Sequence, residues 1–217
     1  MTRNQFDGTN NSMLYLAADS PWSRVVKLCF INANISHATN VLTWKDLKLP
    51  VANRGALNQV PTFHFKGEIY TDSFLILAKI FISKKWIWSA DALLFKAIQD
   101  QWGKILHLMY FLKQAQDSRH SRLVLEQLRE SFLAIESQLR IVLAEKSTSI
   151  EIAPGQALLQ IMICYLNYFE KNTVHQMPQI FFEVIKKVEN SYGFDVYSEY
   201  LMLNGSILPI LVDVSKN

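Results

Sequence analysis

The sequence predicts an α/β domain followed by an all-α helical bundle domain. Up to Ser83, short strand-like stretches alternate with helical ones, whereas from Ala90 onward apolar residues recur at helical spacing throughout. The length of 217 residues is sufficient for two small domains. We expect a flexible tail over residues 1–12, a first domain over 13–83, a linker over 84–89 and a helical domain over 90–217.

The composition is that of a folded globular protein, because half of the residues are hydrophobic and 19% are charged. The longest apolar run, 157–166, is interrupted by Gln160 and is shorter than the roughly 20 residues that span a bilayer. Polar residues precede the short apolar stretch 13–18, and no basic segment leads into it, which argues against a signal peptide. We therefore expect a cytoplasmic protein without a membrane partner.

The cysteines, the histidines and the net charge argue against a disulfide, a metal site and a nucleic-acid partner. Cys29 and Cys164 both lie in apolar helical patterns, which predicts two buried, reduced thiols. The five histidines show no ligand spacing with each other or with cysteine, so we expect no metal. The net charge of +3 is too small and scattered to indicate a nucleic-acid partner.

The first domain is predicted to contain two helices and four strands, and Lys66-Gly67 forms the turn of a hairpin. Thr71-Asp72-Ser73 offers capping side chains for the second helix. The predicted order is a strand over 13–17, a helix over 22–34, a strand over 39–43, an irregular link, strands over 60–65 and 68–71, and a helix from Phe74 to Ile80. This β-α-β, β-β-α order is the thioredoxin arrangement.

The second domain is predicted to be helical throughout. Its clearest segment carries apolar residues three and four apart between Leu125 and Val142, with Glu136 and Arg140 paired on the outer side. Two further helices are expected to begin at prolines, one over 154–169 and one from 178 to about 193.

Ser20-Pro21-Trp22-Ser23-Arg24 connects the first predicted strand to the first helix. In a thioredoxin fold this is the place of a Cys-x-x-Cys pair, on a helix turn whose amides and dipole favour an anion. Serine occupies both cysteine positions, so the protein cannot itself perform thiol–disulfide exchange there. The Ser20 hydroxyl could donate a hydrogen bond to a bound thiolate and lower the pKa of that thiol, or it could simply cap the helix.

Two other short segments could bind a ligand. A cis bond between Val60 and Pro61 would leave the backbone of Val60 free to pair with a peptide, although a trans proline can also begin a strand. Asp72-Ser73 begins a helix, where free amides and a hydroxyl could hold a carboxylate or could serve only as a cap.

Together these segments resemble the amino-terminal domain of cytosolic glutathione transferases, over about residues 13–83. The serine-proline-aromatic start is similar to that of tau-type and many bacterial members. The matching stretches are Leu14-Tyr15, Ser20 to Val25, Gln59 to Phe63 and Asp72 to Leu77, and 165–169 resembles a Tyr-Leu-Asp-Phe-Arg stretch of bacterial relatives.

The resemblance implies a role for each matching residue. Ser20 would bind the glutathione sulfur, and Val60, ahead of a cis Pro61, would pair with the cysteinyl backbone. Ser73 would bind the γ-glutamyl carboxylate with help from Asp72, and Gln59 would lie near the glycyl end. An apolar electrophile would lie between the domains, where the candidates to line its pocket, or only to pack, are Trp102, His107 and Tyr110.

The resemblance further implies a homodimeric transferase in detoxification, with glutathione as co-substrate. A non-catalytic binding or dimerisation module is the alternative, and glutathione-dependent peroxide reduction would use the same site. The chain departs from the family at 54–58, where relatives carry Asn-Pro, and in the link 44–57, which lacks a clear helical pattern. Residues 152–155 also lack the family's capping Asp, which predicts an uncapped helix at a cost of about 1 kcal/mol.

Overall fold

The computed structural model describes residues 12–17, 20–35, 37–42, 59–82, 85–114, 118–145, 153–169 and 177–183. The predicted link over 44–57, the last helix beyond residue 183 and, apart from Ser12, the predicted tail over 1–12 fall outside these ranges.

The first part contains a four-stranded mixed sheet in the order β2-β1-β3-β4. β1 and β2 are parallel, whereas β1 with β3 and β3 with β4 are antiparallel. The strands are β1 (Met13–Ala17), β2 (Ala38–Leu42), β3 (Thr62–Phe65) and β4 (Glu68–Tyr70). This topology confirms the predicted thioredoxin-like order, with strand ends shifted by one or two residues.

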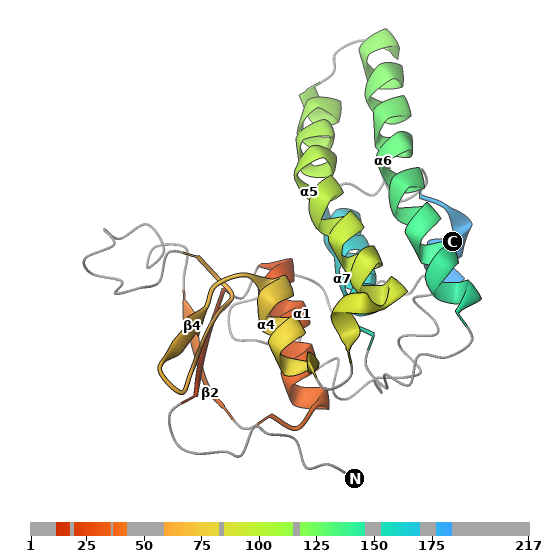
Figure 1. Ribbon diagram of the computed structural model, residues 1–217. Helices are drawn as coiled ribbons and strands as arrows, with labels where there is room; N and C mark the ends of the chain where they lie inside the picture. The colour runs from red at the N-terminus through yellow and green to blue at the C-terminus, as the bar shows by residue number, and fades with distance from the viewer. Residues whose placement is uncertain are drawn as a thin grey trace.

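Helices α1 (Pro21–Asn32) and α4 (Ser73–Ile80) cover one face of this sheet (Figure 1). Alternate strand residues point toward them, so Leu14, Leu16 and Phe63 are completely buried. α1 ends two residues before the predicted position, because Ala33 is its C-cap and Asn34 takes a positive φ of 51°.

The hairpin between β3 and β4 turns at Lys66 and Gly67, as predicted. Their φ angles are 49° and 81°, and two successive positive values are the feature of the turn type that matches the twist of paired strands. Glycine at the second position takes this conformation without steric cost.

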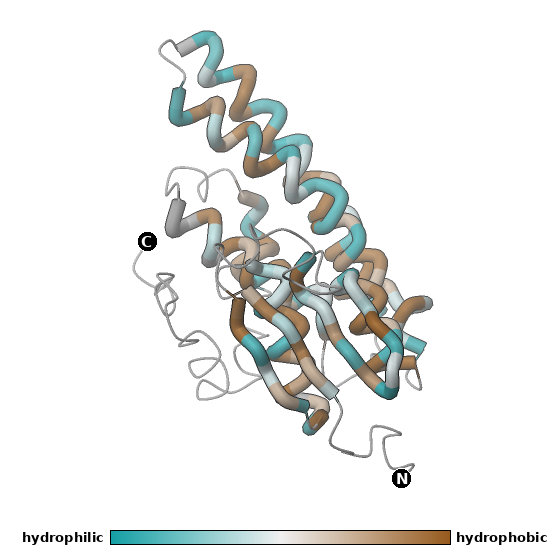
Figure 2. Tube along the Cα trace, turned by 90° about the vertical axis from the view of Figure 1, so that its left-hand side faces the viewer, coloured by the Kyte–Doolittle hydropathy of each residue, from teal (hydrophilic) through white to brown (hydrophobic). Residues whose placement is uncertain are grey.

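The second part is helical, as predicted, and begins with the short 3₁₀ helix η2 (Trp86–Trp88). The long helices are α5 (Ala90–Gln114), α6 (Ser118–Ala144) and α7 (Pro154–Phe169), and residues 179–183 are also helical. α5 and α6 lie side by side and project beyond the rest of the molecule (Figure 1). Figure 2 shows hydrophilic and hydrophobic residues alternating along both, which is the pattern of amphipathic helices. None of the helices in the described ranges is sufficiently long and apolar to cross a membrane.

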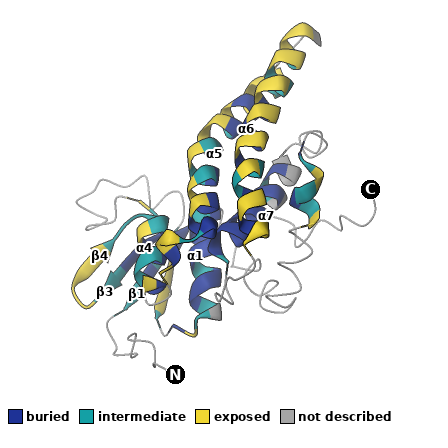
Figure 3. Ribbon diagram, turned by 45° about the vertical axis from the view of Figure 1, so that its right-hand side comes forward, coloured by how far each residue is buried: buried dark blue, intermediate teal, exposed yellow. Residues whose placement is uncertain are grey.

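One continuous core joins the two parts. The buried side chains of α1 and α4 belong to the same cluster as those of α5, α6 and α7. α1 packs against α7, and Figure 3 shows both helices mostly buried. On α6, Arg140 forms the predicted outer ion pair with Glu136, at 2.5 Å. The predicted fold class is confirmed: a thioredoxin-like sheet domain is followed by a helical domain.

The prediction that the helix from Pro154 begins uncapped is wrong. Asp91, in the first turn of α5, is completely buried, and its carboxylate accepts hydrogen bonds from the amides of Gly155 at 2.8 Å and Gln156 at 3.1 Å. The indole of Trp86 donates a third bond, at 2.8 Å. The cap of α7 therefore comes from another helix, which local sequence inspection could not detect.

Candidate functional site

The three segments singled out in the sequence meet at one edge of the sheet. Because β1 and β3 are antiparallel with Tyr15 opposite Thr62, the end of β1 lies beside the start of β3. β4 returns toward the same edge, with Tyr70 opposite Phe63. Hence Ser20 after β1, Val60-Pro61 before β3 and Asp72-Ser73 after β4 lie together. The chain topology, rather than their order in the sequence, brings these residues to one place.

Ser20 is the N-cap of α1. Its Oγ accepts a hydrogen bond of 3.3 Å from the amide of Ser23, and only 6% of the residue is exposed. The Oγ of Ser23 in turn accepts a bond of 3.1 Å from the amide of Ala17. Ser20 therefore caps the helix, which is one of the two roles predicted for its hydroxyl. It uses a lone pair of the hydroxyl, and the O–H remains available because it donates to no partner among the described residues.

The peptide bond between Val60 and Pro61 is cis. The amide and carbonyl of Val60 make no hydrogen bond with other described residues, since the pairing of β3 begins at Thr62. The segment is held from both sides: Thr62 Oγ1 donates to the Gln59 carbonyl at 2.5 Å, and Gln59 Nε2 donates to the Thr71 carbonyl. An extended peptide backbone could pair with Val60 in this position.

Asp72 is the N-cap of α4, and its Oδ1 accepts a hydrogen bond of 3.1 Å from the Leu75 amide. Ser73 follows it with 4% exposure, and its hydroxyl has no hydrogen-bond partner among the described residues. The first amides of a helix have no partner inside it and favour negative charge. The start of α4 thus combines one carboxylate, one hydroxyl and the positive end of a helix.

Helix α5 passes beside this edge. Trp22, in the first turn of α1, contacts the rings of Phe95 at 6.0 Å and Trp102 at 6.2 Å between centroids. Trp102 is 7% exposed and also packs against Tyr165 of α7, at 5.5 Å. Of the three residues proposed for the acceptor pocket, Trp102 therefore lies close to the turn that carries Ser20.

His107 and Tyr110 lie farther along α5 and are exposed. Both contact Phe111 of the same helix, at 4.6 and 6.2 Å between ring centroids. The helical rise from Trp102 to Tyr110 is about 12 Å, so Tyr110 is well removed from the edge of the sheet. The structure brings neither residue to Ser20.

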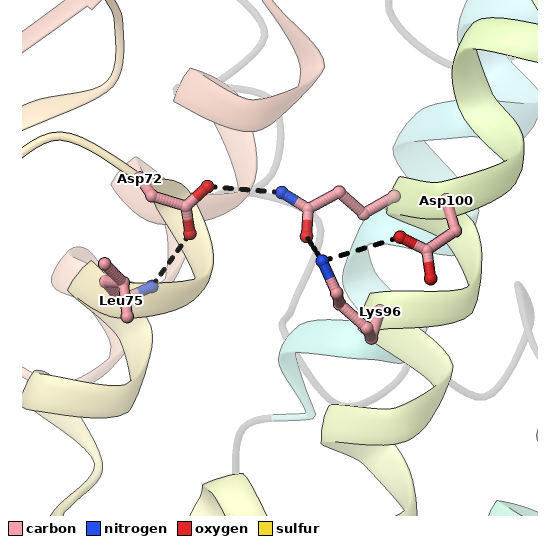
Figure 4. Close-up of polar contacts among 5 residues, drawn as sticks. Asp72, Leu75, Lys96 and Asp100 are labelled. Carbon is pink, nitrogen blue, oxygen red and sulfur yellow. Dashed lines mark hydrogen bonds and ion pairs between the residues drawn. The ribbon is translucent and has the colours of Figure 1, made fainter.

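Sequence inspection missed Gln99, a residue of α5 that reaches this edge. Its Nε2 donates a hydrogen bond of 3.3 Å to Oδ2 of Asp72, and Figure 4 shows the polar contacts that continue from there to Asp100. The available signal was spacing, because Phe95, Gln99 and Trp102 are four and three residues apart and share one face of the helix.

Cys29 does not supply a reactive thiolate. It is a free, completely buried cysteine of α1, as predicted, and burial raises its pKa well above the usual range, with a further increase from the Asp91 carboxylate. Cys164 belongs to α7, and its side chain is not among those described. Over the described residues, no group of three or more His, Cys, Asp and Glu side chains could hold a metal ion.

Solved structures share this architecture, although no family model and no curated protein matches the sequence. A tau class glutathione S-transferase from mango, Mangifera indica, is 12% identical with a TM-score of 0.64, over 88% of this chain and 96% of that one. Glutathione transferase Omega 3C from Trametes versicolor is 12% identical with a TM-score of 0.62, over 91% and 93%. Glutathione S-transferase-I bound with lactoylglutathione is also 12% identical, with a TM-score of 0.61, over 89% and 99%. The chain has the fold of the glutathione transferases, which confirms the resemblance at the level of the fold.

Proposed function

We propose that this protein is a glutathione transferase, which binds glutathione at the sheet edge and transfers it to an apolar electrophile. The observation that supports this proposal most is the meeting of Ser20, Val60 and Ser73 at one edge of a glutathione-transferase fold. A neighbour in fold was solved with lactoylglutathione, so this architecture accommodates a glutathione derivative. In this proposal residues 13–83 bind glutathione and residues 90–217 contribute the acceptor side.

Ser20 would activate the thiol. Its O–H would donate to the glutathione sulfur at the positive end of α1, and the thiol would release its proton to solvent. Each unit by which the thiol pKa falls corresponds to about 1.4 kcal/mol of preferential thiolate stabilisation. The thiolate would then attack the electrophilic carbon, form a C–S bond and expel the leaving group with its electron pair.

The peptide part of glutathione would lie along the same edge. Val60 would pair with its cysteinyl backbone in the manner of an added strand. Ser73 and the first amides of α4 would bind the γ-glutamyl carboxylate, and the Asp72 carboxylate would face the ammonium group. The glycyl end would extend toward Gln59.

The electrophile would bind on the α5 side. Trp102 would form the part of this pocket closest to Ser20, and His107 and Tyr110 would extend it along α5. We further propose that the protein acts as a homodimer in the cytoplasm, in detoxification.

A series at Ser20 separates the cap from the catalytic role. Ser20→Asp keeps an acceptor for the Ser23 amide but has no hydrogen to donate and repels a thiolate. We expect Ser20→Thr to retain most activity toward chlorodinitrobenzene, and Ser20→Asp and Ser20→Ala to lose about 100-fold in kcat/KM. Unchanged turnover in Ser20→Ala would remove this residue from the mechanism.

The alternative is a non-catalytic binding or dimerisation module. The approach to Gln59 favours it, because residues 54–58 lack the Asn-Pro that relatives carry ahead of the Val-Pro pair. Retention on immobilised glutathione decides between the two. A dimer that washes straight through and conjugates no electrophile would support the module.

A further inference from the structure

The carboxylate of Asp72 is held by two different elements. Oδ1 accepts from the Leu75 amide at 3.1 Å, which completes the cap of α4. Oδ2 accepts from Nε2 of Gln99 at 3.3 Å, and Gln99 belongs to α5, the first long helix of the helical domain. The cap requires only the first contact, so the second has no necessary role in forming α4.

The neighbours of Gln99 fix the orientation of its amide group. Its Oε1 accepts from Nζ of Lys96 at 3.0 Å, and that Nζ also lies 3.5 Å from Oδ1 of Asp100 (Figure 4). An ionised carboxylate only accepts and an ammonium only donates, so the NH₂ group must face Asp72 and the oxygen must face Lys96. Glutamine satisfies both neighbours at once, and glutamate would repel Asp72.

This arrangement adds little to the stability of the fold. The side chains of Lys96 and Asp100 are 54% and 60% exposed, and ion pairs that are this open to solvent contribute little. Its geometric effect is on the orientation of the Asp72 carboxylate, since both of its oxygens accept a hydrogen bond. The two contacts leave lone pairs on the carboxylate for a further donor.

We propose that Gln99 is a positioning residue for the γ-glutamyl end of glutathione, which it orients through Asp72. This inference rests on the function proposed above. The Asp72 carboxylate is the acceptor for the ligand's α-ammonium group, and Gln99 keeps it directed at that group. The helical domain thereby contributes to recognition of glutathione itself, in addition to forming the acceptor side.

The test compares two ligands and four proteins by isothermal titration calorimetry. The ligands are glutathione and its glutaryl analogue, in which hydrogen replaces the α-amino group. The proteins are the wild type, Gln99→Leu, Gln99→Glu and the control Gln101→Leu, which replaces a glutamine of the same helix whose side chain makes no hydrogen bond with the described residues. Circular dichroism melts establish that each variant is folded.

We expect Gln99→Leu to weaken glutathione binding roughly tenfold and Gln99→Glu to weaken it further, while the analogue binds all four proteins within about twofold. In turnover, the KM for glutathione should rise and kcat should be retained. Equal glutathione affinity in wild type and Gln99→Leu, or equal weakening of both ligands, would overturn the role of Gln99 and leave the proposed function intact. A wild type that binds neither ligand would overturn both.

Discussion

Gly155 lies against Asp91 so closely that a side chain at residue 155 would collide with the backbone. A Cβ there would be 2.3 Å from the Asp91 carbonyl oxygen and 2.9 Å from Oδ1 of its carboxylate. The same close approach allows the Gly155 amide to donate to that carboxylate at 2.8 Å. The starts of α5 and α7 are thus joined at a point where only glycine fits.

Gly155→Ala should destabilise the protein by about 2 kcal/mol or more, because the added methyl group forces the two helix starts apart. The matched control is Gly103→Ala on α5, where a Cβ would meet nothing within 4 Å. That change should be neutral or should stabilise the helix by about 0.5–1 kcal/mol. Urea unfolding of both variants measures the difference, and equal stability would contradict the contact.

Asp91→Asn should lower the free energy of unfolding by about 2–3 kcal/mol, because the new NH₂ group would face donors at a buried position. Burial raises the pKa of Asp91, while its three N–H donors act in the opposite direction. The control is Asp100→Asn, since the Asp100 side chain is 60% exposed. We expect its effect to stay within about 0.5 kcal/mol. Denaturant midpoints that move equally in both variants would disprove the buried cap.

Trp86→Phe removes the indole donor to Asp91 and keeps most of the aromatic packing. It should cost about 1–2 kcal/mol, because one of the three buried bonds to the carboxylate is lost. Trp88→Phe is the natural comparison, since Trp88 is 82% exposed. Thermal melts should distinguish the two variants. A larger loss of thermal stability in Trp88→Phe than in Trp86→Phe would contradict the hydrogen bond between the Trp86 indole and Asp91.

Stability should fall as the pH is lowered below 6.5, in part because of His37. Burial lowers the pKa of His37 and the nearby Lys27 ammonium lowers it further, whereas its bond to the Ile35 carbonyl partly offsets them. Nε2 of His37 lies 3.0 Å from Nζ of Lys27 and Nδ1 lies 2.6 Å from that carbonyl, so the neutral ring accepts at Nε2 and donates at Nδ1.

The folded pKa lies below the unfolded value, so the unfolded chain binds the proton more tightly. The stabilisation is therefore present above 6.5 and is lost as the pH falls through the folded pKa, by up to about 1.4 kcal/mol per pH unit. The variant His37→Gln should lack this pH-dependent contribution to the free energy of unfolding. Urea unfolding of both proteins across this pH range provides the measurement, and parallel pH profiles would exclude His37 as the source.

Local patterns predicted most of the fold. The strand β1, the Lys66-Gly67 turn and the capping position of Asp72 each depend on neighbours in the chain, and each occurs where it was predicted. The capping role of Ser20 is equally local. Contacts within a few residues leave a periodic or compositional signal in a sequence.

Contacts between distant residues are not identified by such a signal, because the sequence does not show which partner a residue meets. The amide of Gly155 is capped by Asp91, 64 residues away, and Asp72 accepts from Gln99, 27 residues away. An acidic residue in the first turn of a helix is ordinarily expected to interact with the dipole of that same helix. That the Asp91 carboxylate caps α7 depends on how α5 and α7 pack, which only the assembled fold determines.

The pKa of the glutathione thiol bound to the protein most directly tests whether Ser20 at the start of α1 stabilises a thiolate. It is obtained by following the ultraviolet absorbance of the thiolate against pH in the wild type, in Ser20→Ala and in Ser20→Thr. A free cysteine thiol ionises near 8.5, and we predict a bound value near neutral in the wild type and in Ser20→Thr, with a return toward the free value in Ser20→Ala. The same lowered pKa in Ser20→Ala, or no lowering in the wild type, would contradict the proposed activation.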